Sequence, residues 1–349
     1  MNLTPNTQTL DLDTLLTCSL QWVKAGHGVA LATVTRTWGS SPCPVGSHLV
    51  VRDDGAFEGS VSGGCIEGEV VTESLAVMRT QIDKRITFGI ANEDAWRVGL
   101  SCGGKIEIYI IALVNKLTIN LKRILAAKNR KIPTALLMDM TRARTFVWAG
   151  DLEEKDTKLS CAKISRLTSC FESDRSGFIT RDDEPDLFAR IYNPNLRLLI
   201  CGAVHIAQHL ANMAMRGGYD VTVIDPRDTW STEARFPGIK LDRRWPSAAI
   251  DDLNPDARTA IVTLSHDSKL DDPTLIAAIE SDAFYIGSLG SQRTHAARLS
   301  RLKGNGATDI QLKRIHAPIG LDIGAESPAE IAVSALAQIT AKLRKPALN

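Results

Sequence analysis

The sequence has no excess of either charge and no long hydrophobic run. Its 41 Lys and Arg residues nearly balance its 40 Asp and Glu residues, so the formal net charge is +1. A nucleic-acid-binding surface usually shows a basic excess or a basic stripe. No apolar stretch approaches the roughly 18 residues that a membrane span needs. We therefore expect a protein that binds neither nucleic acid nor a membrane.

Signals for export and for metal or disulfide frameworks are also lacking. Residues 1–16 do not place a basic segment before an apolar one, so we expect no signal peptide. The seven cysteines are an odd number and are scattered along the chain, which argues against a disulfide framework. No Cys-x-x-Cys pair is present, so we expect no structural zinc site and no metal ligands. A reducing cytoplasm is the expected location.

The first part of the chain, residues 1–192, predicts an α+β domain. The chain of 349 residues is long enough for two cores. Apolar spacing predicts helices over about 10–26 and from Gly64 to about 79. Strands are expected at 28–35, 48–51, 56–61 and 106–113, with a hairpin turn at 53–55. Residues 116–192 are less readable: 134–140 and 145–148 indicate strands, and 172–185 a loop.

Residues 193–349 instead alternate strands with helices. Strands are expected at 196–201, 220–225, 259–264 and 283–286, each followed by helical sequence, of which 205–216 is the first. Such alternation implies a parallel sheet with helices on both faces. The predicted fold class is therefore α/β, with a Rossmann-like parallel-sheet domain preceded by the α+β domain.

The turn after the first of these strands resembles a dinucleotide-binding fingerprint. Gly202 ends the strand, His205 opens a helix whose amide groups suit a pyrophosphate, and Asp225 ends the next strand in position to bind a ribose hydroxyl. Val204 stands where the fingerprint has its second glycine, which opposes the usual binding mode. Nucleotide binding and a purely structural turn both remain open.

Two further turns should lie at the same edge of the sheet. Gly287, Gly290 and Ser291 form a glycine-rich anion cradle, to which Arg293 can add a bidentate phosphate contact. The alternative is that these glycines only make a tight turn. His266 and Asp267 follow the third strand, where they line the crevice or merely cap the next helix.

Cysteines beside paired glycines mark the first domain. The thiol of Cys65 lies at a predicted helix start, where the helix dipole lowers a thiol pKa. Glycines next to a thiol let a bulky ligand approach the sulfur, and Cys43 lies on a third loop that could face the same cavity. The residues of this candidate cluster are Cys43, Ser62, Gly63, Gly64, Cys65, Glu67, Cys102, Gly103 and Gly104. The alternative is that the thiols are small buried side chains in tight turns.

These motifs occur together in one known family. They are Gly39-Ser-Ser-Pro, Pro44-Val-Gly46, Ser62-Gly-Gly-Cys-Ile-Glu67, residues 95–104, Cys201-Gly-Ala-Val-His-Ile-Ala207, residues 285–293, residues 315–325 and Ser327-Pro-Ala-Glu-Ile331. In this order they resemble the XdhC/CoxI family, whose members help to mature molybdenum hydroxylases such as xanthine dehydrogenase. Val204, in place of a common glycine, and Cys43, in place of an expected basic residue, depart from the family pattern.

The resemblance implies a chaperone without turnover of its own. Such a protein binds the molybdenum cofactor, as molybdopterin or its cytosine dinucleotide form, and protects it while a cysteine desulfurase installs its sulfur. It then delivers the cofactor to the large subunit of an apo molybdenum hydroxylase. A molybdenum cofactor nucleotidyltransferase is a further expected partner, and a homodimer is the expected assembly. The cysteine cluster would face the sulfur or the metal.

Under the same resemblance, a second group of residues would hold the phosphate or nucleotide part of the cofactor. They are Gly202, His205, Asp225, His266, Gly287, Gly290, Ser291 and Arg293. Two alternatives belong to other classes. The Rossmann pattern also fits an NAD(P)-dependent oxidoreductase, although no proton-donor set is evident. A binding module that recruits the desulfurase without touching the cofactor is the other.

Overall fold

The computed structural model describes residues 12–39, 41–89, 104–149, 159–181, 184 and 186–344. The chain divides into two compact units, Met1–Pro194 and Asn195–Asn349. Each unit has its own sheets and its own core, and each is described by itself. Within the described residues, no helix combines the length and the apolar character needed to span a bilayer.

The first unit contains a five-stranded antiparallel sheet. Its strands are β1 (Val29–Trp38), β2 (His48–Arg52), β3 (Phe57–Gly59), β4 (Lys84–Phe88) and β5 (Lys105–Ala112), in the order β3-β2-β1-β5-β4. The expected hairpin turn lies between β2 and β3, where Gly55 has a φ of +86° that favours glycine. Helix α2 (Glu67–Thr80) covers one face and buries Val70 and Val77 against it.

A second antiparallel sheet shares a core with the first. It contains β6 (Thr134–Asp139), β7 (Arg144–Trp148), β8 (Gly177–Phe178) and β9 (Leu187–Tyr192), in the order β7-β6-β9-β8. Helices α1 (Leu12–Lys24) and α3 (Asn115–Asn129) contribute Leu16 and Leu121 to the shared core, together with Leu31 and Phe188 of the sheets. Helix α4 (Cys161–Ser173) packs Leu167 against the other face of the second sheet.

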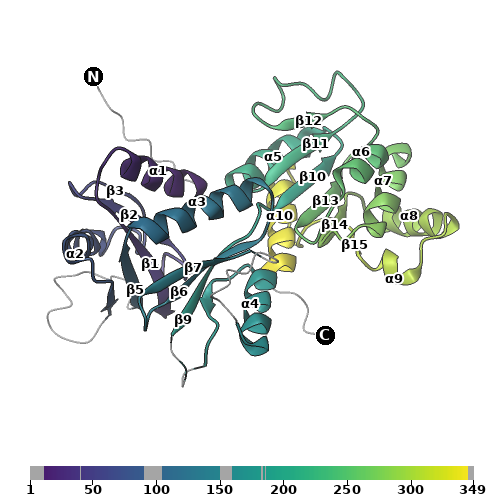
Figure 1. Ribbon diagram of the computed structural model, residues 1–349. Helices are drawn as coiled ribbons and strands as arrows, with labels where there is room; N and C mark the ends of the chain where they lie inside the picture. The colour runs from purple at the N-terminus through teal and green to yellow at the C-terminus, as the bar shows by residue number, and fades with distance from the viewer. Residues whose placement is uncertain are drawn as a thin grey trace. The chain divides into compact units, whose positions relative to one another are not determined.

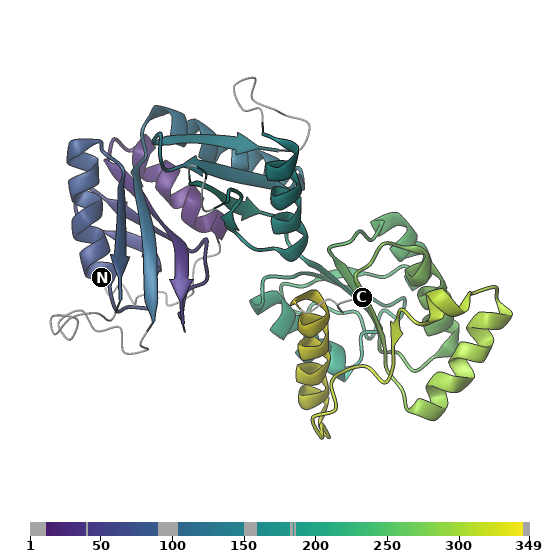
Figure 2. The ribbon, with the colours of Figure 1, turned by 90° about the horizontal axis from the view of Figure 1, so that it is seen from below.

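The second unit is built on a six-stranded parallel sheet (Figures 1 and 2). Its strands are β10 (Arg197–Cys201), β11 (Asp220–Ile224), β12 (Lys240–Asp242), β13 (Thr259–Thr263), β14 (Tyr285–Ser288) and β15 (Ile315–His316). They lie in the order β12-β11-β10-β13-β14-β15, which is the 3-2-1-4-5-6 order of a Rossmann sheet. The predicted fold class is confirmed. In this topology ligands bind beyond the carboxyl ends of the central strands, where the strand order reverses.

Helices cover both faces of this sheet because side chains alternate along each strand. Helices α5 (His205–Arg216) and α10 (Pro328–Arg344) share one core with the side chains of Leu198 and Ile200. Helices α6 (Pro246–Leu253), α7 (Ser268–Glu280), α8 (Gln292–Gly304) and α9 (Asp309–Leu312) belong to the other side. There Leu275 and Leu302 pack against Leu199.

Candidate functional site

One carboxylate organises the cysteine-bearing loop before α2. Glu67 accepts hydrogen bonds from the hydroxyls of Ser60 and Ser62 and from the backbone amides of Val61, Ser62, Gly64 and Ile66. Burial alone would raise the pKa of Glu67, but the hydrogen bonds from Ser62, Ser60 and the backbone prevail and lower the pKa to about 2. Glu67 is therefore an ionised structural centre of the loop.

The two glycines of this loop, Gly63 and Gly64, are exposed to solvent. Gly63 and Gly64 have φ angles of +77° and +110°, which other residues rarely adopt. A Cβ atom placed on Gly64 would meet nothing within 4 Å. The outer side of the loop is thus open to a partner or ligand next to the thiol of Cys65, which is half-buried against the apolar core under α2.

The predicted third thiol lies on a neighbouring loop. The Cys43 Sγ donates to the Ser60 Oγ at 3.6 Å, and Ser60 in turn donates to Glu67. Pro42 lies against Gly63, where an added Cβ would approach the proline Cβ to 3.2 Å. Gly104 is buried close to Gly39, whereas Cys102 and Gly103 fall outside the described residues. The structure thus joins the Cys43 and Cys65 loops through Ser60 and Glu67.

In the second unit, the turn between β10 and α5 lies against the backbone of Ser265, which follows β13. Gly202 has a φ of +107°, and a Cβ atom there would lie 2.8 Å from the backbone nitrogen of Ser265. Val204 occupies the N-cap position of α5 without a side-chain hydrogen bond to the helix. His205 opens α5 as an exposed side chain, and its ring lies 5.0 Å from that of His209.

Asp225, the expected ribose acceptor, follows β11 as predicted but is fully buried. One carboxylate oxygen accepts from the Ala203 amide (2.7 Å) and the Arg227 Nη2 (2.6 Å), and the other from the Arg227 backbone amide and Nε. Burial opposes ionisation, but these donors, chiefly Arg227, hold the pKa of Asp225 below its usual value. In this geometry a ribose could reach the carboxylate only by displacing these donors.

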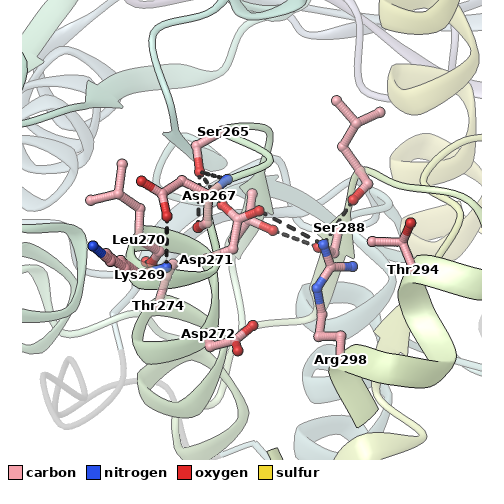
Figure 3. A network of polar contacts seen from close by, with 12 residues as sticks. Ser265, Asp267, Lys269, Leu270, Asp271, Asp272, Thr274, Ser288, Thr294 and Arg298 are labelled. Atoms are coloured by element: carbon pink, nitrogen blue, oxygen red, sulfur yellow. Dashed lines mark hydrogen bonds and ion pairs between the residues drawn. The ribbon is translucent and has the colours of Figure 1, made fainter. Parts of the chain in front are cut away.

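The residues after β13 include a helix cap. Asp267 is the N-cap of α7 and accepts from the Lys269 amide at 2.9 Å. Ser265 donates from its hydroxyl to the Asp271 Oδ1 at 2.6 Å (Figure 3). His266 is exposed and has a φ of +61°. The capping alternative therefore holds for Asp267, and His266 is the exposed member of this turn.

The glycines of the β14–α8 turn have different surroundings. Gly287 lies within the strand, where a Cβ would come within 2.7–2.8 Å of Tyr285 and Ile319, so packing requires this glycine. Gly290 has a φ of +138°, and Ser291 caps α8 by accepting from the Thr294 amide at 3.2 Å. Arg293 is exposed in the first turn of α8. The exposed cap and Arg293 fit an anion cradle.

A buried arginine beneath this turn was not predicted. The Arg298 guanidinium, 3% exposed, donates to the Leu289 carbonyl at 2.9 Å and lies 3.7 Å from the Asp271 carboxylate (Figure 3). Its Nε and Nη1 and the Asp271 Oδ2 have no hydrogen-bond partner among the described residues. Burial, opposed by Ser265 and Arg298, raises the pKa of Asp271. The sequence signal was an arginine four residues before Leu302 on the buried face of α8.

The carboxyl edge of the parallel sheet thus collects the turns at Gly202, Asp225, Ser265 and Gly290. The described residues hold no group of three or more His, Cys, Asp or Glu side chains arranged to bind a metal ion. Convergence of the cysteine loops of the first unit with this edge stays a prediction.

Comparisons with known proteins match both units. Residues 22–89 match the XdhC and CoxI family, and residues 198–339 match the XdhC Rossmann domain. A molybdenum cofactor insertion chaperone of Escherichia coli, PaoD, is 29% identical over 94% of this chain and 88% of its own length. A Bacillus subtilis protein named as a probable xanthine dehydrogenase subunit is 25% identical over 88% of this chain and 91% of its own.

The fold as a whole is found in a solved structure. A crystal structure described as a xanthine dehydrogenase from Bacillus halodurans superposes with a TM-score of 0.76. It is 23% identical, and the match covers 95% of this chain and 96% of the other. The likeness of fold therefore extends over both units.

Proposed function

Because this chain belongs to the XdhC and CoxI family, we propose that it is a molybdenum cofactor insertion chaperone for a hydroxylase of the xanthine dehydrogenase type. The observation that carries the proposal is the likeness to the Escherichia coli chaperone along 94% of this chain. Such likeness includes the cysteine loop and the Rossmann turns together. A function that needs both units accounts for it better than one that uses the Rossmann domain alone.

The cargo is the molybdenum cofactor, as molybdopterin or its cytosine dinucleotide form. The pyrophosphate of the dinucleotide form would lie at the β14–α8 turn, where the Ser291 cap, the start of a 13-residue helix and Arg293 meet. Helix amides and a guanidinium are suitable donors to a phosphate. The buried Arg298 adds a second positive charge beneath Gly290, because a Cβ on Gly290 would lie 3.7 Å from its Nη2.

The cysteine loops would hold the metal end of the cargo. Glu67 fixes the loop, the glycines leave its outer side open, and Cys65 lies directly after them. Cys43 reaches the same loop through Ser60. These thiols, with Cys102, would shield the molybdenum centre until a cysteine desulfurase supplies its sulfur. The protein itself performs no turnover in this scheme.

The central experiment measures cargo retention. Purified protein is incubated with molybdenum cofactor and passed through a desalting column, and retained pterin is measured by fluorescence after oxidation. We expect retention well above that of an unrelated protein, and weaker retention or hydroxylase activation with Cys65→Ala. Cys161→Ala, an exposed cysteine on α4, is the matched control. Retention equal to that of the unrelated protein would refute the chaperone role.

Partners and alternatives are tested separately. We propose delivery to the large subunit of an apo hydroxylase, contacts with a cysteine desulfurase and a nucleotidyltransferase, a homodimeric assembly and a cytoplasmic location. Pull-downs with cofactor-loaded and cofactor-free protein distinguish a carrier from a module that only recruits the desulfurase. Titration with NADH tests the oxidoreductase alternative, for which we expect no saturable fluorescence change.

A further inference from the structure

At the end of β11, an arginine covers the carboxylate that a Rossmann domain usually presents to its ligand. Asp225 is fully buried and both its oxygens are occupied, two of the donors being the Arg227 Nε (2.8 Å) and Nη2 (2.6 Å). The Arg227 side chain remains 35% exposed. Its Nη1 has no acceptor among the described residues, so that nitrogen is available to a ligand.

The ring of Trp230 contacts this guanidinium and also a second one. The Arg227 Cζ lies 4.5 Å from the centre of the Trp230 ring, and the Arg235 Cζ lies 5.2 Å from it. Arg235 also donates from Nη1 to the Trp230 carbonyl at 2.7 Å. In the described part of the chain, Arg235 forms no ion pair with a carboxylate, so its charge is not neutralised locally.

The segment that carries these residues is fixed to the sheet and to α5. The amides of Trp230 and Ser231 donate to the Arg227 carbonyl at 2.9 and 3.1 Å. The Ser231 hydroxyl donates to the Asp225 carbonyl, and the Gln208 side chain of α5 donates to the Arg235 carbonyl at 3.0 Å. The fold therefore holds in place the segment on which both guanidinium groups contact the Trp230 ring.

Such an arrangement suits an anion and not a sugar diol. Ribose hydroxyls need a free carboxylate, whereas an arginine after the second strand accommodates a phosphate group. We infer that Arg227 and Arg235, held against Trp230, form a phosphate-monoester subsite at the carboxyl end of β11. The chain that follows lines a surface groove of about 750 Å³ with Glu233, Ile239, Lys240, Leu241, Asp242 and Arg243.

If the bound phosphate belongs to the molybdenum cofactor, this subsite is part of the cofactor site and the inference rests on the proposed function. A phosphate monoester could come from molybdopterin or from a free nucleotide, and both present the same group to the two arginines. Replacing the phosphate contact by an uncharged side chain should lower affinity about tenfold or more, the usual effect of losing charge-assisted hydrogen bonds.

The test compares 5′-CMP with cytidine by calorimetry on the full chain. We expect wild-type protein to bind CMP at least tenfold more tightly than cytidine, and Arg235→Met to remove most of this difference. Arg216→Met, an exposed arginine at the far end of α5, should bind CMP as the wild type does. Equal affinity for CMP and cytidine, or full CMP binding by Arg235→Met, overturns the inference.

Further variants protect the test against misfolding. Arg227→Met removes two donors from Asp225, so its thermal unfolding is measured first, whereas Arg235→Met and Trp230→Leu leave those donors in place. If Arg235→Met loses both CMP and molybdopterin, the subsite serves the cargo. If it loses CMP only, the subsite takes a separate nucleotide. Failure of wild-type protein to retain cargo refutes the chaperone proposal and leaves the CMP comparison valid.

Discussion

The carboxylate of Asp225 and the backbone amide of Ala203 are joined by a hydrogen bond of 2.7 Å. This bond ties the end of the second strand to the turn after the first, at the point where a Rossmann domain receives its ligand. An amide that would otherwise be available to a pyrophosphate is thereby used within the chain. A pyrophosphate bound at this edge would need donors from the neighbouring turns instead.

We expect Asp225→Ala to destabilise the protein by about 3 kcal/mol, because it leaves the Ala203 amide without its acceptor and Arg227 without its carboxylate. Urea unfolding of the full chain measures the loss. Asp228→Ala, whose side chain is largely exposed, should change stability by less than about 0.5 kcal/mol. Similar losses in the two variants would contradict this account of the Asp225 site.

Gly202→Ala should be damaging for two reasons that a control can separate. Its φ of +107° strains any other residue, and its Cβ would lie 2.8 Å from the Ser265 nitrogen. Gly218 has a φ of +84° but open space around it. We expect Gly218→Ala to cost about 1 kcal/mol from strain alone and Gly202→Ala clearly more, as measured by thermal unfolding. Equal costs would show that contact with Ser265 is unimportant.

Arg298 and Asp271 should be energetically coupled. Arg298→Met leaves a buried carboxylate without its cation, and we expect a loss of about 3 kcal/mol. The double variant Arg298→Met with Asp271→Asn should recover part of this loss, since no buried charge then remains. A double-mutant cycle measures the coupling, for which we expect about 1 kcal/mol or more. Strict additivity would mean that the 3.7 Å separation is too great for a useful interaction.

The folded state should lose stability in acid because Glu67 becomes protonated. Its folded pKa of about 2 is below the ordinary value of 4.5, so ionised Glu67 favours the folded state above pH 4.5, and this contribution is lost as the pH falls from about 4.5 to 2. The shift corresponds to about 3 kcal/mol. Hydrogen exchange of the peptide over residues 60–70 measures it.

The matched variants for this prediction lie on the same helix. Glu67→Gln should speed exchange of the Ser62 and Gly64 amides at pH 6, because it removes the charge that binds them. Glu69→Gln changes an exposed residue two positions along α2 and should leave exchange unaltered. Unchanged protection in Glu67→Gln would show that the loop does not depend on this carboxylate.

Regular alternation explains which parts of the fold the sequence predicted. The parallel sheet was foreseen because most of its strands are short apolar runs followed by helices, and α5 has the predicted bounds. The expectation of a helix directly after β11 was wrong, because turns lead from β11 to the short polar strand β12. Helices α3 and α4 and strands β4, β8, β9, β12 and β15 were not foreseen, and the loop expected over 172–185 contains the end of α4 and strand β8. Helix α4 is rich in serine and cysteine and buries only Leu167 fully, so its periodic signal is weak. Strand β4 is an edge strand with exposed residues.

The sequence predicted where the candidate site residues lie better than it predicted which groups they contact. Asp225 follows its strand as expected, yet only the folded chain shows that Arg227 turns back to occupy it. Asp271 and Arg298 come from different helices, so no local pattern joins them. Glu67 was singled out as part of a motif, but its role as acceptor for the preceding backbone depends on loop geometry that residue spacing does not specify.

The carboxylate of Glu67 has a further consequence for how the cysteine loop meets a guest. Six donors from the loop converge on this one side chain, so the shape of the loop is set by its own helix. A thiol carried on such a preorganised loop surrenders little conformational entropy on association. If the proposed ligand binds at this loop, little of its binding free energy is therefore spent on ordering the loop.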